Sequence, residues 1–259
     1  MSPSRLHTLE ECELNWVIGD LGGDPGGTTA GLGTIIHAAL EHSDGSDEAA
    51  LWATVEARWG ELTFEAPWRE RAELTRARDL VRRLHLYLRR FEAAGGALVE
   101  AEPHFEVAIP LGDDEAFEHG AILSGYIDRV ELTPEGAVVI LDLKTGKNEP
   151  QTDARVLDNP QLSAYQLAFE AGAISAAAGH ASGGAKLLVL RPTAQKADYA
   201  TPWQPPFDDE RRAVFFERIR DAVDVMRGTA FRAPYEEHCR DEYSYGLCRI
   251  HTVAAVSAS

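Results

Sequence analysis

Cysteine and long apolar runs are both scarce in this chain. Its 259 residues include three cysteines, and a small, odd number of thiols argues against a disulfide framework. The longest apolar runs, such as residues 137–141, are far too short to cross a bilayer. The N-terminal residues lack the apolar run behind a basic start that a secretory signal has. These absences predict a cytoplasmic protein with no membrane partner.

Positive charge is scarce as well. The chain has 25 basic and 42 acidic residues, a net charge of −17. Proteins that bind nucleic acid through its phosphates are normally basic on at least one face, so the average composition counts against that function. The arginine-rich segment 69–90 departs from the average. It is either a solvated helix face with ion pairs four residues apart or a strip that faces DNA.

A nucleotide-binding loop is also missing. Residues 19–33 are rich in glycine and form a loop by composition. No predicted strand precedes them, and no Gly-Lys-Ser/Thr ends them. We therefore expect any ATP-driven motor to lie elsewhere.

The first 95 residues are predicted to be largely helical. Apolar residues recur at helical spacing over 34–42, 47–61 and 67–94. A further helix is expected over residues 2–17, with Ser2 as its cap and Pro3 in its first turn.

The pattern changes to strands after Gly96. Apolar and polar residues alternate over 98–110 and 121–132, and a more continuously apolar strand over 137–143 follows the turn at 133–136. A helix capped by Asn159, a strand over 186–190 and a helix over 208–227 complete the pattern. We predict one α/β domain over 1–259, with a helical part (1–95), an α/β core carrying the site (96–200) and a C-terminal helix with a cysteine-bearing tail (201–259).

Three charged residues gather on the predicted hairpin. Asp128 lies on one strand, and Asp142 and Lys144 lie on its partner as Asp-Leu-Lys. Residues two apart on a strand face the same side, and the hairpin can bring Asp128 beside them. Two acids at the end of an apolar strand cost free energy unless a cation sits between them, and Mg²⁺ or Mn²⁺ meets that need. The alternative is a surface hairpin with an Asp–Lys ion pair, the commoner origin of so short a motif.

This set of residues suits phosphodiester hydrolysis. A divalent ion held by Asp128, Asp142 and the backbone carbonyl of Leu143 would polarise the phosphodiester and lower the pKa of a bound water. Lys144 would orient that water or stabilise charge in the transition state.

Four motifs, in order, resemble the RecB-like branch of the PD-(D/E)xK nuclease superfamily. SPSRLHTLEEC (2–12) is similar to its opening helix, and LGTIIHAALE (32–41) to its Gly-x-x-x-His motif. GYIDRVE (125–131) and VVILDLKTGK (138–147) resemble its Asp and Asp-x-Lys core, and QLSAYQLA (161–168) its Gln-x-x-x-Tyr motif. The likeness spans nearly the whole chain and is greatest to the C-terminal nuclease domains of AdnA and AdnB helicase–nucleases.

The resemblance implies a fold, site residues and partners. The fold would be restriction-endonuclease-like, a mixed β-sheet flanked by helices. His37 would be an additional metal ligand, and Gln161 and Tyr165, one helical turn apart, would contact DNA or brace the site. The substrate would be DNA, with single strands favoured, and a helicase motor in the same chain or in a partner subunit would act in double-strand break repair. We expect Glu41 to face solvent, while Arg129 is open between a phosphate contact and an ion pair.

The cysteines resemble the remains of an iron–sulfur site. Relatives carry one cysteine near the N-terminus and a C-x2-C-x5-C motif near the C-terminus, and thiolates suit such clusters. Cys12, Cys239 and Cys248 match three of these positions, but Glu242 stands at the fourth. Either Glu242 is an oxygen ligand to a cluster, or no cluster is bound and the thiols pack as small apolar groups.

Three functions remain open from the sequence. The leading hypothesis is a metal-dependent DNA nuclease domain. The alternative is a catalytically silent DNA-binding or scaffolding module, which the net charge of −17 and the altered cysteine motif favour. The third is a stand-alone exonuclease related to the CRISPR-adaptation nucleases. Metal-dependent cleavage of single-stranded DNA separates the first from the second.

Overall fold

A mixed β-sheet with helices on both sides makes up the computed structural model, which describes residues 1–21, 28–42, 47–110 and 120–234. The helices are α1 (Pro3–Glu11), α2 (Glu13–Asp20), α3 (Thr28–Glu41), α4 (Glu48–Arg58), α5 (Pro67–Ala93), α6 (Asp153–Val156), α7 (Pro160–Glu170) and α8 (Asp209–Arg227), with short 3-10 turns at Trp59–Glu61 and Ser175–Ala177. The strands are β1 (Ala97–Ala101), β2 (His104–Ile109), β3 (Ala121–Tyr126), β4 (Arg129–Leu132), β5 (Ala137–Lys144), β6 (Ala181–Val189) and β7 (Trp203–Gln204).

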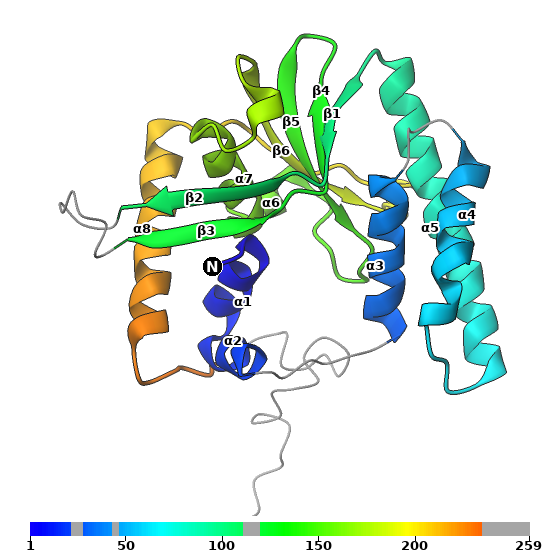
Figure 1. Ribbon diagram of the computed structural model, residues 1–259, viewed down its shortest axis with the longest axis horizontal. Coiled ribbons are helices and arrows are strands. Elements are labelled where there is room, and N and C mark those ends of the chain that lie inside the picture. Colours follow the sequence, from blue (N-terminus) through cyan, green and yellow to red (C-terminus); the bar gives the residue numbers. More distant parts are fainter. Residues whose placement is uncertain (22–27, 43–46, 111–119, 235–259) are drawn as a thin grey trace, which may run out of the picture.

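The central sheet has five strands in the order β1-β4-β5-β6-β7. β5 and β6 pair in parallel, and the other neighbours pair antiparallel. β2 and β3 form a separate antiparallel ribbon, which runs from the middle of the molecule toward α8 in Figure 1. The predicted fold class is therefore confirmed: an α/β arrangement with a mixed sheet, flanking helices and a helical N-terminal part.

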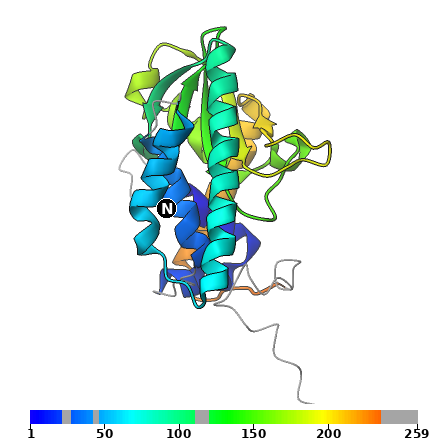
Figure 2. The same cartoon turned by 90° about the vertical axis from the view of Figure 1, so that its right-hand side faces the viewer.

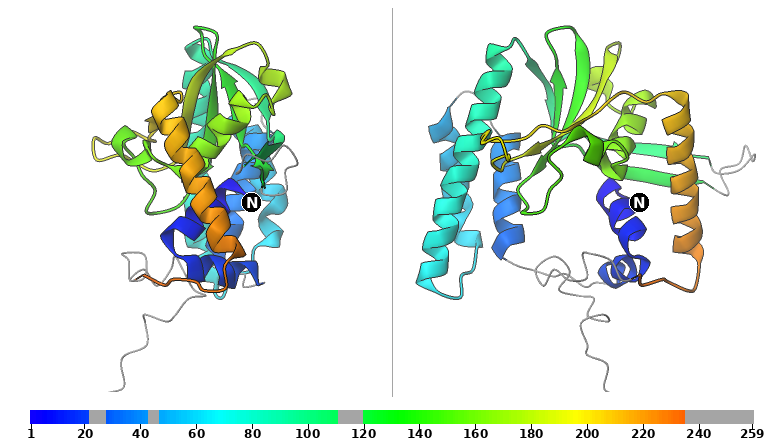
Figure 3. Two further views of the ribbon diagram at one scale, coloured as in Figure 1. Left: turned by 90° about the vertical axis from the view of Figure 1, so that its left-hand side faces the viewer. Right: turned by 180° about the vertical axis from the view of Figure 1, so that it is seen from behind.

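Helices cover both faces of this sheet. Figures 1 and 2 show α3, α4 and α5 packed together on one side, and Figure 3 shows α1, α7 and α8 on the other. Each group of helices closes its own apolar core against the sheet.

β5 lies between these two cores and is buried on both faces. Val138 and Ile140 pack with α1, α7 and α8, whereas Leu141 and Leu143 pack with α3, α4 and α5. A strand buried on both faces has a continuous apolar sequence, as this one does. Because side chains alternate along a strand, Asp142 points to the same side as Ile140, toward α7.

Side-chain caps fix where the predicted helices begin. Ser2 Oγ accepts a hydrogen bond from the Arg5 amide at the start of α1, with Pro3 as the first helical residue. Asn159 Oδ1 does the same for the Leu162 amide of α7, and Asp208 caps α8. The turn predicted at 133–136 is also present, closed by Gly136, which has a φ of 84°.

The N-terminal helices differ from the prediction in two ways. The single helix expected over 2–17 is two helices, because Cys12 has extended backbone and turns the chain. This turn lets Leu6 of α1 and Trp16 of α2 enter the same core. The loop expected over 19–33 is partly helical, since α2 ends at Asp20 and α3 begins at Thr28.

The strands are more numerous than predicted, because the two long strands expected over 98–110 and 121–132 are each divided, whereas β6 begins at Ala181, earlier than the expected 186. The strand expected over 98–110 is broken at Glu102 and Pro103, where proline has no N–H to donate and Glu102 has a φ of 49°. The strand expected over 121–132 is broken at Ile127 and Asp128. The short elements α6 and β7 carry too few residues to show a periodic pattern, and the sequence does not predict them.

Candidate active site

The pairing of β4 with β5 brings Asp128 and Asp142 together. Arg129 lies opposite Leu141 in this antiparallel pair, so the next residues toward the end of the sheet are Asp128 and Asp142. Lys144 ends β5, two residues beyond Asp142 and on the same face. The three residues predicted from the sequence therefore meet at one end of the sheet.

Asp142 is held by three side chains. Its Oδ1 accepts hydrogen bonds from Gln161 Nε2 at 2.6 Å and from the Tyr165 hydroxyl at 3.2 Å. Lys144 Nζ lies 2.9 Å from its Oδ2 and donates to Gln161 Oε1 at 2.8 Å. Gln161 and Tyr165 sit one turn apart on α7 and contact each other at 2.8 Å. In this structure both residues brace the acid and the lysine.

Asp128 is held from the opposite side, between β5 and α3. The Leu143 backbone N–H donates to its Oδ2 at 2.6 Å. His37 Nδ1 of α3 lies 3.1 Å from its Oδ1. The Leu143 side chain is buried, so this residue meets the site through its backbone alone. His37 reaches Asp128 because α3 packs against the side of β5 that carries Leu143.

Burial and charge shift the pKa values of the site in a common direction. Burial raises the pKa of Asp142 although the Lys144 ammonium lowers it, and the Asp128 charge raises it again. Burial would lower the pKa of Lys144, but the Asp142 carboxylate holds it above its usual value. Burial would likewise lower the pKa of His37, but its hydrogen bond to Asp128 and the charge of that carboxylate raise it. Each shift favours the proton-bound state of its group.

One buried oxygen marks where a cation fits. Asp142 Oδ2 is ion-paired with the Lys144 ammonium at 2.9 Å. A carboxylate oxygen can accept more than one partner, and Mg²⁺ and Mn²⁺ take such hard oxygen donors.

The metal site is not preformed. Within the described residues, no three His, Cys, Asp or Glu side chains already surround a metal position. The donors fit a divalent ion in kind: the carboxylates of Asp128 and Asp142 and the imidazole of His37. The hydrogen bond between His37 and Asp128 has to open before they can close around one.

Two further acids near the site were not predicted. Glu102 follows β1 and lies across from Asp128, whose carbonyl accepts its backbone N–H at 3.2 Å. Burial raises the pKa of Glu102, and a hydrogen bond with Glu41 raises it further. Glu41, which we expected to face solvent, is 37% exposed and also interacts with Glu102. Strand pairing across the break is the signal that would have placed Glu102 beside Asp128.

Glu149 is the second missed acid. It folds back over Gly146, where a β-carbon would collide with its carboxylate. Burial raises the pKa of Glu149, against the lowering effect of the Lys144 charge. It lies in a loop beyond β5, where strand periodicity gives no position.

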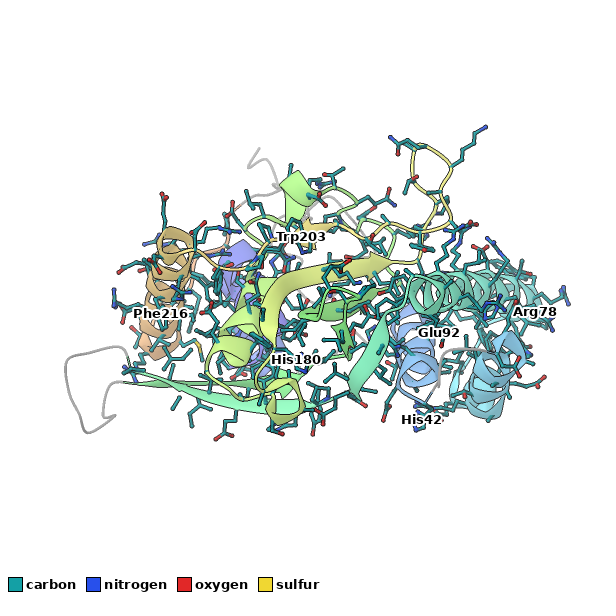
Figure 4. The ribbon with its side chains drawn as sticks, turned by 90° about the horizontal axis from the view of Figure 1, so that it is seen from above. His42, Arg78, Glu92, His180, Trp203 and Phe216 are labelled. Atoms are coloured by element: carbon teal, nitrogen blue, oxygen red, sulfur yellow. The ribbon has the colours of Figure 1, made fainter. Side chains whose placement is uncertain are left out.

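The cations near the site are largely engaged in ion pairs. Arg129 pairs with Glu131 at 2.9 Å, and both side chains are buried, which decides between the two roles left open for Arg129. On α5, several arginines of segment 69–90 pair with neighbouring acids: Arg69 with Glu65, Arg82 and Arg83 with Asp79, and Arg82 and Arg90 with Asp198. Arg78 lies over the Trp52 ring at 4.6 Å, and Figure 4 shows it at the outer edge of the molecule. The structure thus supports an ion-paired helix face.

The candidate iron–sulfur residues lie mostly outside the described residues. Cys239, Glu242 and Cys248 belong to the segment 235–259. Cys12 is buried at the junction of α1 and α2. The cluster stays a prediction of the sequence resemblance.

Comparison with known proteins identifies the superfamily of the chain. The family model of the PD-(D/E)XK nuclease superfamily matches residues 1–250. The chain belongs to that superfamily, whose members are in general metal-dependent nucleases that use Mg²⁺ or Mn²⁺ to cleave phosphodiester bonds. No curated protein matches the chain.

Among solved structures, the chain is similar to one described as "Crystal structure of SSO0001". The two are 13% identical, with a TM-score of 0.36, over 89% of this chain and 90% of that one. Along the described parts of the chain, no helix is both long and apolar enough to span a membrane.

Proposed function

We propose that this chain is a metal-dependent DNA nuclease domain with Asp128, Asp142 and Lys144 at its catalytic centre. The observation that carries the proposal is the meeting of buried Asp142, its ion-pair partner Lys144 and Asp128 at one end of the sheet. His37 and the backbone carbonyl of Leu143 are the further proposed metal ligands.

Each side chain has a distinct role in the proposed reaction. When bound by Asp128 and Asp142, a divalent ion would polarise the phosphodiester and lower the pKa of a water. The Lys144 ammonium orients the attacking water or donates to the phosphate oxygens as their charge grows. Gln161 and Tyr165 keep Asp142 and Lys144 in place through their hydrogen bonds.

The substrate and context follow from the resemblance to AdnA and AdnB. We propose single-stranded DNA as the favoured substrate, supplied by a helicase motor in the same chain or in a partner subunit during double-strand break repair in the cytoplasm. Helicase motifs in the neighbouring sequence would support this context, whereas their absence would favour a stand-alone exonuclease.

Cleavage of labelled single-stranded DNA in Mn²⁺ tests the proposal. We expect wild type to cut the strand and Asp142→Asn, which keeps the shape of the side chain, to leave it intact. Glu210→Gln, at an exposed position on α8, is the matched control and should cut like wild type. Equal, metal-independent results for all three proteins would refute the nuclease proposal.

A catalytically silent DNA-binding or scaffolding module is the second candidate. The net charge of −17 and the ion-paired arginines of α5 favour it. It predicts that wild type binds DNA or a partner and leaves the strand uncut in Mn²⁺, with no difference between wild type and Asp142→Asn.

A further inference from the structure

The antiparallel pairs β1–β4 and β2–β3 belong to different sheets, but they follow one another beside the site in the same register. Ala101 lies opposite Arg129 at the end of one pair, and His104 lies opposite Tyr126 at the start of the other. Two backbone hydrogen bonds bridge the break between them, from Glu102 N–H to the Asp128 carbonyl and from Ile127 N–H to the Pro103 carbonyl. The register is therefore kept across the break.

Burial shows which residues of these paired strands face outward. Ile127 and Phe105 are fully buried on the core side. Since side chains alternate along β2 and β3, Tyr126 and His104, which lie opposite each other, are on the outer side. The outer face of this ribbon thus carries an aromatic pair, and Asp128 follows Tyr126 two residues later in the chain, between β3 and β4.

The aromatic pair is open to solvent. The rings of His104 and Tyr126 meet edge to face, with centroids 5.0 Å apart and planes at 62°. Tyr126 is 60% exposed, and His104 is exposed as well. The His104 ring braces the Tyr126 ring, so an aromatic ring is accessible to a ligand near the proposed catalytic carboxylate of Asp128.

The charges around the pair favour a base over a phosphate. Glu102 and Glu106 lie in this stretch of paired strands, the whole chain carries −17, and several arginines of α5 are engaged with acids. Phosphates gain little from such a surface. Stacking of a nucleobase on an aromatic ring is independent of net charge and is a common basis of single-strand binding. A base pair inside a duplex already has both faces stacked, so an unpaired base is the matching ligand.

We propose that Tyr126, braced by His104, is a stacking platform for an unpaired nucleobase of the DNA strand whose phosphate reaches Asp128. The platform rests on the proposed nuclease function and deepens it. It gives single-strand preference a physical origin in these two residues.

Binding to strands with and without bases tests the platform. Fluorescence anisotropy would compare labelled oligothymidylate with the same sugar–phosphate strand lacking its bases, in Ca²⁺, whose loose coordination disfavours hydrolysis. Wild type should bind the strand with bases about tenfold more tightly, within the range for one stacked base. Tyr126→Ala should lose that preference while binding the base-free strand as wild type does, and Tyr126→Phe should retain it.

Two matched controls remove other exposed apolar side chains. Ile122→Ala alters the same outer face of β3 at a 46% exposed position, and Trp68→Ala alters a 64% exposed aromatic at the start of α5. Both should keep the preference of wild type. Thermal unfolding checks that all variants are folded, which the exposure of Tyr126 leads us to expect.

The outcomes separate the platform from the nuclease proposal. If wild type cuts DNA in Mn²⁺ and Tyr126→Ala raises KM about tenfold with kcat unchanged, both stand. If wild type cuts but Tyr126→Ala keeps the wild-type KM and base preference, the platform is wrong and the nuclease stands. If nothing cuts but the base preference depends on Tyr126, the platform stands in a DNA-binding module. If wild type shows no preference for bases, the platform is wrong.

Discussion

The buried cluster around Glu131 offers the most quantitative test of how the site is supported. Glu131 is completely buried next to the strand end that carries Asp128. It accepts hydrogen bonds from Arg129 at 2.9 Å and the Tyr87 hydroxyl at 2.6 Å, and pairs with Lys186 at 2.8 Å. Glu131→Gln keeps the shape of the side chain and removes the one negative charge of this group.

The expected loss of stability is about 3 kcal/mol. Removing one partner of a buried ion pair costs about 3–5 kcal/mol. Arg129 is only 4% exposed and cannot lose its proton, so it bears the full penalty. Lys186, 16% exposed, can reach water, and the rings of Tyr87 and Phe91 lie near these cations. Both effects favour the lower end of the range.

Equilibrium unfolding in urea at neutral pH measures this loss. For a chain of this length, about 3 kcal/mol corresponds to a fall in Tm of roughly 6–12 °C. Glu92→Gln, an exposed position on α5, should change stability by less than about 0.5 kcal/mol. In an Arg129→Met background the cost of Glu131→Gln should shrink. A cost below about 1 kcal/mol, or the same cost in both backgrounds, would refute the reasoning.

Four further predictions concern metal binding, folding, catalysis and DNA affinity. Mn²⁺ competes with the proton of His37, whose pKa is raised. Calorimetric Mn²⁺ affinity should therefore rise with pH between about 5 and 8, and rise less steeply in His37→Ala. Without metal, the stability that His37 contributes to folding should be fully present below the pKa of the histidine in the unfolded chain. It should fall as pH rises through the raised pKa of the folded state, which urea unfolding at a series of pH values would show. Gln161→Ala should lower kcat roughly 10–100-fold. Tyr165→Phe should lower kcat less, because Gln161 still holds Asp142. If both variants keep the kcat of wild type, these residues do not brace the site. DNA affinity should depend weakly on salt, with a slope in log K against log salt less steep than about −2, and a steeper slope would show that the ion pairs of α5 open to phosphates.

The fold was largely predictable because its main elements carry strong local signals. Caps at Ser2, Asn159 and Asp208 fixed the starts of three helices, and the apolar run of β5 fixed a strand buried on both faces. The breaks were not predictable in the same way. Cys12 and Glu102 adopt backbone conformations that depend on what the neighbouring segments pack against, and no periodicity encodes them.

The residues of the candidate site were likewise predictable only where a local pattern places them. Asp142 and Lys144 are two residues apart on one strand, so the sequence alone places them on one face. His37 reaches Asp128 from a helix 91 residues earlier, which only the resemblance to a family suggested. Glu102 and Glu149 lie in a strand break and in a loop, where alternation gives no direction, so the sequence does not place them beside the site.

The acidity of the chain and the burial of its site both bear on how the proposed nuclease would attract DNA. Asp142 is buried by two cores that meet at β5, and its negative charge is held by Lys144 at one oxygen and by two hydrogen-bond donors at the other. Several arginines of α5 are engaged with acids. In the proposed nuclease, attraction for a strand would then come from a divalent ion at the acids and from the base-stacking face of Tyr126 more than from a basic surface. A helicase partner that delivers the strand, as we propose, would compensate for this weak attraction.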